Sequence, residues 1–171
     1  WSCIAGKIGD LQIGLATGAE FLLAKTEKNS EKYSEELYWL AAAEWADKNG
    51  ADIINSSLGY TAKRYFNWQM DGKTTFVTRA ANIAARKGML VVNAAGNEGT
   101  DKWHFIGAPA DADSVLSVGG IDPATGYHTS FSSFGPTADK RMKPNVSAYG
   151  HVIAAAPAGL TSTQGTSFAS P

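Results

Sequence analysis

The pattern of apolar and polar positions along the chain predicts alternating helices and strands. Residues 34–49 and 75–87 carry apolar side chains every three or four positions, which is typical of helices with one buried face. Ser34 can cap the first helix, and Gly50 and Gly88 would end the two helices. The side chains expected to face inward are Leu37, Leu40, Ala41 and Trp45 in the first helix, and Phe76, Ala80, Ile83 and Ala84 in the second.

Short apolar runs between these helices predict the strands of a sheet. The runs cover residues 20–25, 51–58, 89–95, 115–118 and 152–155. Strands that alternate with helices are joined by crossover connections, and these favour parallel pairing. We therefore expect an α/β fold, a doubly wound and mainly parallel sheet with helices on both faces. Ligands of such folds gather at the carboxyl ends of the strands.

Composition indicates a globular protein without an obvious nucleic-acid or membrane partner. The chain has 171 residues, of which 44% are hydrophobic and 18% are charged, and this length can bury one sizeable core. The net charge is −1 without a basic run, so we expect no nucleic-acid partner. No apolar stretch approaches the ~20 residues of a membrane span. Cys3 is the only cysteine, which excludes an intrachain disulfide and a zinc site built from cysteines.

The last seven residues, Gly-Thr-Ser-Phe-Ala-Ser-Pro at 165–171, place a serine where a helix is expected to begin. Unpaired backbone N–H groups and a partial positive charge gather at such a helix start. A serine hydroxyl becomes an effective nucleophile when a base takes its proton and donors stabilise the developing charge. A lone Gly-Thr-Ser is more often a loop that closes into a cap. The full string resembles the nucleophile motif of the subtilisin-like serine proteases (subtilases), Gly-Thr-Ser-x-Ala-x-Pro, and this resemblance puts the attacking hydroxyl on Ser167.

A second motif follows the apolar run at 91–95 as a Gly-Asn-Glu-Gly turn at 96–99. It resembles the subtilase segment that carries the oxyanion-hole asparagine, here Asn97. An amide NH₂ can donate a hydrogen bond to a developing alkoxide and does not titrate. Taken alone, the segment also fits an ordinary turn after a core strand. A phosphate-binding loop at 96–99 is a further alternative, but the chain lacks both common glycine-rich phosphate motifs.

A third motif, Ala-Asp-Ile-Ile-Asn-Ser-Ser-Leu-Gly at 51–59, resembles the subtilase strand whose Ser-Leu-Gly end pairs with the substrate and lines the primary specificity pocket. An exposed strand edge can add an extended peptide as another strand. The same residue types also fit an ordinary core strand followed by a loop. The substrate-binding residues implied by the resemblance are Ser57, Leu58, Gly59, Ala94, Ala95, Gly96 and Glu98.

The resemblance also implies which catalytic groups the chain lacks. Residues 1–6 are similar to the helix that follows the catalytic histidine of subtilases, so the histidine and aspartate motifs are expected before Trp1. Residues 1–171 would then form a partial catalytic domain, truncated at both ends. His104, His128 and His151 lie outside any matching motif, although the sequence alone does not exclude one of them as the base.

The expected function is that of a serine endopeptidase that hydrolyses protein or peptide substrates through an acyl-enzyme. This chain would supply Ser167 and Asn97, and alone it is expected to be inactive. The alternative is a catalytically inactive binding domain with the subtilase fold. No cofactor is required and no metal ligand is assigned; the family resemblance allows calcium, although no dense carboxylate loop demands it. Secretion is expected from the resemblance only.

Overall fold

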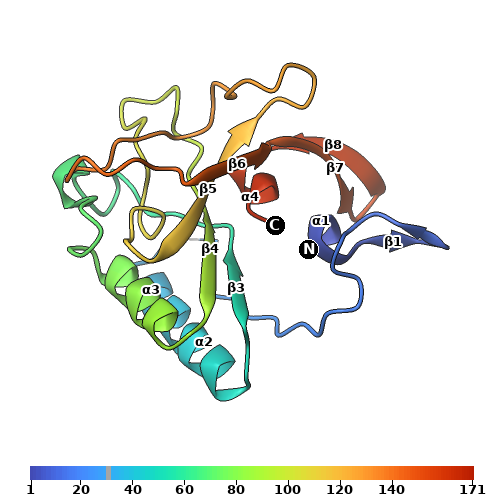
Figure 1. The fold of residues 1–171 in the computed structure, drawn as a ribbon, viewed down its shortest axis with the longest axis horizontal. Helices are drawn as coiled ribbons and strands as arrows, with labels where there is room; N and C mark the ends of the chain where they lie inside the picture. Colours follow the sequence, from blue (N-terminus) through green and yellow to red (C-terminus); the bar gives the residue numbers. More distant parts are fainter. Residues whose placement is uncertain (30–31) are drawn as a thin grey trace.

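A parallel sheet forms the centre of the computed structural model, which describes residues 1–29 and 32–171 (Figure 1). The sheet has four strands in the order β3 (Ile53–Ser56), β4 (Leu90–Ala94), β5 (Val115–Ile121) and β6 (Val146–Tyr149). All three neighbouring pairs are parallel, with Ile54 opposite Val91 and Val91 opposite Val115. The predicted α/β fold with a mainly parallel sheet is therefore confirmed.

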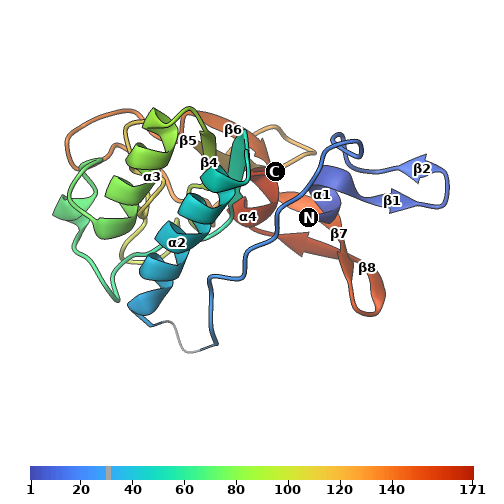
Figure 2. The same cartoon turned by 90° about the horizontal axis from the view of Figure 1, so that it is seen from below.

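Helices cover both faces of this sheet. The helices α2 (Ser34–Lys48) and α3 (Phe76–Arg86) pack side by side on one face, and the short α4 (Thr166–Ala169) lies on the other (Figures 1 and 2). Thr75 caps α3 by accepting a hydrogen bond from the Thr78 amide at 3.3 Å. Ser34 is the first residue of α2, so its predicted role as the cap is wrong, and Tyr33 occupies that position.

The buried face of α2 differs from the predicted one. Leu37 and Trp45 are 57% and 42% exposed, and Ala41 is exposed as well. Trp39 sets the orientation instead, because its indole N–H donates to the Ser56 hydroxyl at 3.0 Å and the ring is buried. Apolar residues occur on more than one side of α2, so spacing alone did not identify the buried side. The residues that pack inward are Trp39, Ala43 and Ala46, with Leu40 half-buried at the edge.

The prediction for α3 is partly confirmed. Ala80 and Ala84 are buried as expected, and Val77 joins them at the centre of the core. Phe76 is only half-buried, and Ile83 is wrong because it is 46% exposed. The core lies between α2, α3 and the sheet. Its largest buried side chains include Trp39, Met70, Val91 and Trp103.

The strand expected at residues 20–25 is absent. Phe21 is half-buried and packs edge-on against the Trp1 ring, whereas Leu22 and Leu23 are 45% and 70% exposed. A strand requires a hydrogen-bonded neighbour, and residues 20–25 have none among the described residues. An open edge of the sheet is that of β3, which in the same part of the chain pairs only with β4. The segment at 20–25 therefore runs as coil.

Two hairpins extend away from the parallel sheet (Figure 2). The strand expected at 152–155 is present as β7 (His151–Ala156), but it pairs antiparallel with β8 (Gly159–Gln164) and not with the main sheet. The other hairpin joins β1 (Lys7–Ile8) and β2 (Leu11–Gln12) after the short helix α1 (Ser2–Ala5). The 3-10 turn η1 (Asn67–Gln69) precedes α3. None of the helices in the described ranges has the length and apolar character needed to cross a membrane.

Candidate active site

Two segments that are far apart in the sequence meet where β3 ends and α4 begins. The Ser57 hydroxyl donates to the Ser167 carbonyl at 2.9 Å, and the Ser167 hydroxyl donates to the Ser57 carbonyl at 3.1 Å. The helix α4 starts after Gly165, whose φ of 147° lies in a region that favours glycine. The predicted nucleophile and the predicted substrate-binding strand are thus in direct contact.

Asn97 is anchored to the same helix start by one end of its amide. Its Oδ1 accepts hydrogen bonds from the Thr166 backbone N–H at 2.8 Å and from the Thr166 hydroxyl at 3.0 Å. The Thr166 hydroxyl also accepts from the Gly96 N–H at 3.2 Å. Among the described residues, Asn97 Nδ2 donates to no partner, and a side chain built on Gly165 would lie 3.7 Å from it. The amide oxygen is therefore tied down beside Ser167, while the amide NH₂ remains available.

The turn at 96–99 is held in place by Ser133, a buried residue for which the sequence analysis predicted no role. The Ser133 hydroxyl donates to the Glu98 carboxylate at 3.0 Å and accepts from the Glu98 N–H at 3.1 Å. Gly96 has a φ of 115°, and a Cβ there would lie 2.5 Å from Glu98 Oε2 and 2.7 Å from Ser133 Oγ. Only glycine fits at this position. The signal that could have pointed to it is the run of polar and aromatic residues Ser-Phe-Ser-Ser-Phe-Gly at 130–135.

Comparison with known proteins assigns the family. The model of the subtilase family, Peptidase_S8, matches residues 2–171. The chain belongs to the subtilase family. It is 38% identical to subtilisin DY of Bacillus licheniformis over 133 residues, which cover 77% of this chain and 43% of that protein. It is 32% identical to subtilisin NAT of Bacillus subtilis subsp. natto over 178 residues, which cover 98% of this chain and 42% of that protein.

Solved structures agree with this assignment. The self-cleaved protease domain of PatA superposes with a TM-score of 0.79 at 27% identity, over 99% of this chain and 60% of that one. The patellamide maturation protease PatA superposes with a TM-score of 0.78 at 27% identity, over 99% and 58%. This subtilase chain therefore has the fold of subtilisin-like proteases. It spans less than half the length of the two subtilisins.

The residues predicted to line the substrate cleft of this subtilase are not equally exposed. Gly59 is exposed and Leu58 is half-buried, whereas Ala94 and Ala95 are 4% and 0% exposed. Ala94 and Ala95 can thus shape a cleft only through their backbone. A hollow of about 420 Å³ opens beside Gly59 and Glu98. Its other lining residues are Glu27, Tyr60, Thr61, Ala62, Lys63, Arg64, Asp101, Lys102 and Trp103.

A buried ionic network holds one side of this hollow. The Arg64 guanidinium lies over the Tyr60 ring, 4.1 Å from its centroid, and binds the buried carboxylates Glu35 at 2.5 Å and Glu36 at 3.5 Å. The Tyr65 hydroxyl donates to Glu36 at 2.5 Å. Burial raises the pKa of Tyr60 and of Tyr65, so both phenols stay protonated. The hydrogen bond from the Lys28 N–H is the main cause that lowers the pKa of Glu35. The segment after Gly59 is therefore anchored to the start of α2.

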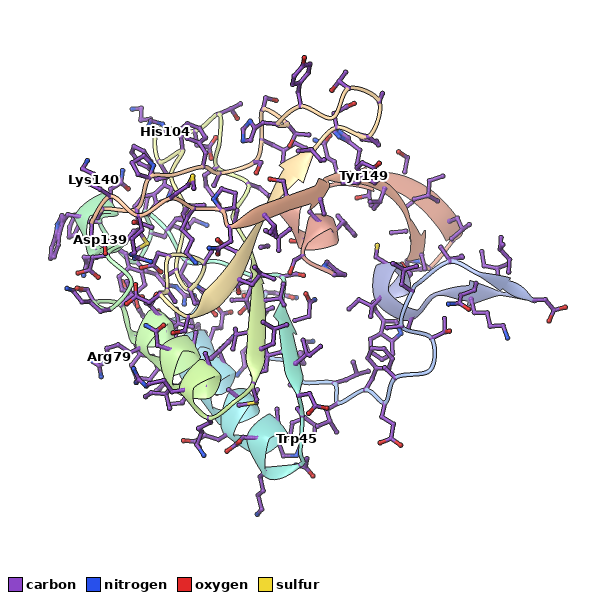
Figure 3. The ribbon with its side chains drawn as sticks, in the orientation of Figure 1. Trp45, Arg79, His104, Asp139, Lys140 and Tyr149 are labelled. Carbon is purple, nitrogen blue, oxygen red and sulfur yellow. The ribbon has the colours of Figure 1, made fainter. Side chains whose placement is uncertain are left out.

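None of the three histidines takes the place of a catalytic base for Ser167. His104 bonds the Asp101 carbonyl through Nδ1 at 3.1 Å, in a loop well away from α4 (Figure 3). His128 bonds the Ser132 carbonyl at 2.9 Å, and His151 bonds the Gln164 side chain at 2.9 Å. None of these three ring hydrogen bonds is made to Ser167. Ser167 contacts only Ser57 through its hydroxyl in the part of the chain that the structure describes.

Calcium, which the family resemblance allows, finds no cluster of acidic side chains in the described residues. Within residues 1–29 and 32–171, no group of three or more His, Cys, Asp or Glu residues could hold a metal ion. Calcium in proteins is held by six to eight oxygen ligands, several of them from carboxylates. A calcium site stays a prediction from the resemblance.

Proposed function

We propose that this chain is part of the catalytic domain of a serine endopeptidase, to which it supplies the nucleophile Ser167 and the oxyanion donor Asn97. The observation that carries this proposal is the anchored amide of Asn97. Its oxygen is held by Thr166 at 2.8 and 3.0 Å, directly before Ser167, and its NH₂ is left without a partner among the described residues. A donor fixed beside a serine at a helix start is the arrangement that stabilises the oxyanion of acyl transfer.

In the proposed reaction, Ser167 Oγ attacks the carbonyl carbon of the scissile peptide bond. A histidine from a segment outside this chain accepts the Ser167 proton, and an aspartate orients that histidine. The hydrogen bond from Ser167 to the Ser57 carbonyl must break first, because it uses the same proton. Asn97 Nδ2 and the Ser167 N–H donate to the oxyanion. The amine leaves with the proton from the histidine, and water then hydrolyses the acyl ester to free the Ser167 hydroxyl.

The proposed substrates are proteins or peptides that bind in extended form. Segment 57–59 would pair with the peptide backbone, since an open strand edge can add an extended chain. The backbone at Ala94, Ala95 and Gly96 would form the opposite wall, with Glu98 at the rim of the hollow. We also propose that the protein is extracellular, because its sequence is similar to those of the subtilisins. No cofactor and no nucleic acid take part in this reaction.

The proposal is tested by comparing the 171-residue chain with a protein that also carries the histidine and aspartate segments. Both are treated with a fluorophosphonate probe and with casein. We expect labelling at Ser167 and turnover in the longer protein only, and neither in its Ser167→Ala variant. Turnover by the 171-residue chain itself would show that a base within it serves Ser167.

The same experiment separates the enzyme from the alternative of an inactive binding domain. That alternative is favoured by one observation, the engagement of the Ser167 hydroxyl with Ser57 and with no histidine. A longer protein that binds peptides but is neither labelled nor active would establish the binding domain and refute the endopeptidase.

A further inference from the structure

Asn93 is a buried amide between the two walls of the proposed substrate cleft. It lies in β4, one residue before the wall formed by Ala94 to Gly96, and it is 0% exposed. Its Nδ2 donates to the Leu58 carbonyl at 2.9 Å and to the Ala94 carbonyl at 2.8 Å. One amide group is thus bonded to both walls at once.

This amide bridges a gap in the backbone pairing of the substrate-binding segment. The ladder between β3 and β4 ends at Ser56, which lies opposite Asn93. Backbone pairing resumes at Tyr60, which exchanges hydrogen bonds of 2.8 and 3.1 Å with Ala108. Between these points, the Asn93 side chain provides the hydrogen bond that a neighbouring strand would otherwise give to Leu58. It therefore continues the ladder past the end of the strand.

The direction of the Leu58 carbonyl determines which edge of segment 57–59 stays open. Successive carbonyl groups of an extended chain point to opposite edges. Asn93 holds the Leu58 carbonyl toward β4, so an extended segment would direct the carbonyls of Ser57 and Gly59 to the outer edge. The Ser57 carbonyl indeed accepts from Ser167, which comes from a different element. The outer edge is where a peptide would add.

The other end of the Asn93 amide suggests that the residue is not there for stability alone. Asn93 Oδ1 is buried and has no hydrogen-bond partner within the described residues. A buried acceptor without a partner is costly, and such groups are rare in folded proteins. The neighbouring positions Val91, Val92 and Ala94 are apolar, so an apolar residue would fit the strand better. The advantage of asparagine lies in the two carbonyls that it holds.

We propose that Asn93 is a positioning residue for substrate binding, whose amide holds segment 57–59 extended so that its outer edge can pair with a peptide. This inference rests on the proposed endopeptidase function. Preorganised pairing stabilises the bound substrate and the transition state alike, so its loss raises KM and leaves kcat nearly unchanged. A substrate too short to reach segment 57–59 does not depend on Asn93.

The test uses the longer protein that carries all three catalytic residues. KM and kcat are measured for a peptide that extends several residues before the scissile bond and for p-nitrophenyl acetate, an ester whose acetyl group has neither a side chain nor a peptide N–H to contact segment 57–59. Asn93→Ala should raise KM for the peptide about fivefold or more, with kcat within about twofold and the ester unaffected. Asn93→Ser keeps one donor and should give a smaller rise, and it replaces Asn93→Ala if that variant does not fold.

Asn82→Ala is the matched control. Asn82 is also a buried asparagine whose amide donates to a backbone carbonyl, that of Gly72 at 2.7 Å, but it lies on α3 away from the cleft. It should destabilise the fold without changing KM for the peptide. Equal KM for wild type and both Asn93 variants would overturn the inference. So would a parallel KM rise for the ester, or a rise of the same size in Asn82→Ala. A wild-type protein that hydrolyses neither substrate would refute the endopeptidase function itself.

Discussion

At the scale of single residues, the arrangement around Thr166 makes Asn97 the most informative position to change. Asn97→Ala should lower kcat by roughly a hundred- to a thousand-fold with little change in KM, because the donor acts on charge that develops only in the transition state. This range is the one found for an oxyanion-hole asparagine in subtilisin. Steady-state kinetics on the longer protein measures it. A kcat within about threefold of wild type would make Asn97 an ordinary turn residue.

Glu98 offers a second prediction, about specificity. Glu98 lines the hollow beside Gly59, and it is the one charged residue among those predicted to bind the substrate. We expect cleavage after large apolar residues such as Phe, Leu, Tyr or Met, and also after Lys through a solvent-screened attraction to Glu98.

The measurement is kcat/KM for a peptide library varied at the residue before the scissile bond. Glu98→Gln keeps the acceptor for Ser133 and should selectively reduce cleavage after Lys by a few-fold, with the wild-type preference weakening as salt is raised. Asp101→Asn is the comparison, since Asp101 is another carboxylate of the same hollow but lies outside the turn at 96–99, and it should reduce cleavage after Lys less than Glu98→Gln does. A strict preference for Asp, Glu or Gly would contradict the assignment of this pocket.

Motifs in the sequence predicted which residues would meet, but not what supports them. The Gly-Thr-Ser and Gly-Asn-Glu-Gly strings pointed to Ser167 and Asn97, and the structure brings the two segments together through Thr166. Their catalytic roles stay predictions. Ser133 was missed because its partner Glu98 lies 35 positions earlier, and a single sequence does not show such a pairing.

At the scale of elements, the orientation of α2 leads to a test with two tryptophans on one helix. Trp39 is 4% exposed and bonds Ser56, whereas Trp45, which is labelled in Figure 3, is 42% exposed. Trp39→Ala should lower the free energy of unfolding by about 3–5 kcal/mol, because it leaves a large cavity and removes a partner of Ser56. Trp45→Ala should change it by less than about 1 kcal/mol. Urea denaturation of both variants measures the difference, and similar losses would show that the helix is rotated.

The elements that the sequence predicted best are those with their own local signals. The helices α2 and α3 have periodic apolar positions and a following glycine, and the strands β3, β4 and β5 lie in short apolar runs. Two expectations failed for the same reason: residues 20–25 form no strand, and β7 joins a separate hairpin and not the parallel sheet. Whether an extended run becomes a strand, and in which sheet, depends on a partner elsewhere in the chain. The strands β6 and β8 were not predicted, since half or more of their residues are polar or small.

At the scale of the whole molecule, the buried carboxyl of Asp111 gives the protein a predictable dependence on pH. Its side chain is 0% exposed and accepts hydrogen bonds from the Thr78 hydroxyl at 2.5 Å and the Gly72 N–H at 2.9 Å. Burial nevertheless raises the pKa of Asp111 to about 6. An unfolded chain loses this proton near pH ~4. The folded state therefore binds more protons than the unfolded state between pH ~4 and ~6, and this group's contribution to stability falls as pH rises through that range.

The corresponding experiment compares wild type with Asp111→Asn, whose side chain stays neutral. As the pH is raised from ~4 to ~7, the difference in free energy of unfolding between the variant and wild type should change by about 2–3 kcal/mol in favour of the variant. Urea denaturation at several pH values measures this gain. Asp113→Asn, which changes a more exposed carboxyl paired with Arg141, is the control and should show no such gain. Parallel curves for wild type and Asp111→Asn would contradict the raised pKa.

The sequence distances across the site imply an order of events during synthesis. Ser57 and Ser167 are 110 positions apart, and Asn97 and Thr166 are 69 apart. Contacts between such distant positions cannot form until the intervening chain has been made, and the ribosome delivers the N-terminal part first. Segment 57–59 and the turn at 96–99 are thus synthesised before Ser167. Because Thr166 ties down the Asn97 amide, the same docking of α4 that brings Ser167 to Ser57 also fixes the proposed oxyanion donor, so neither is in place without the other.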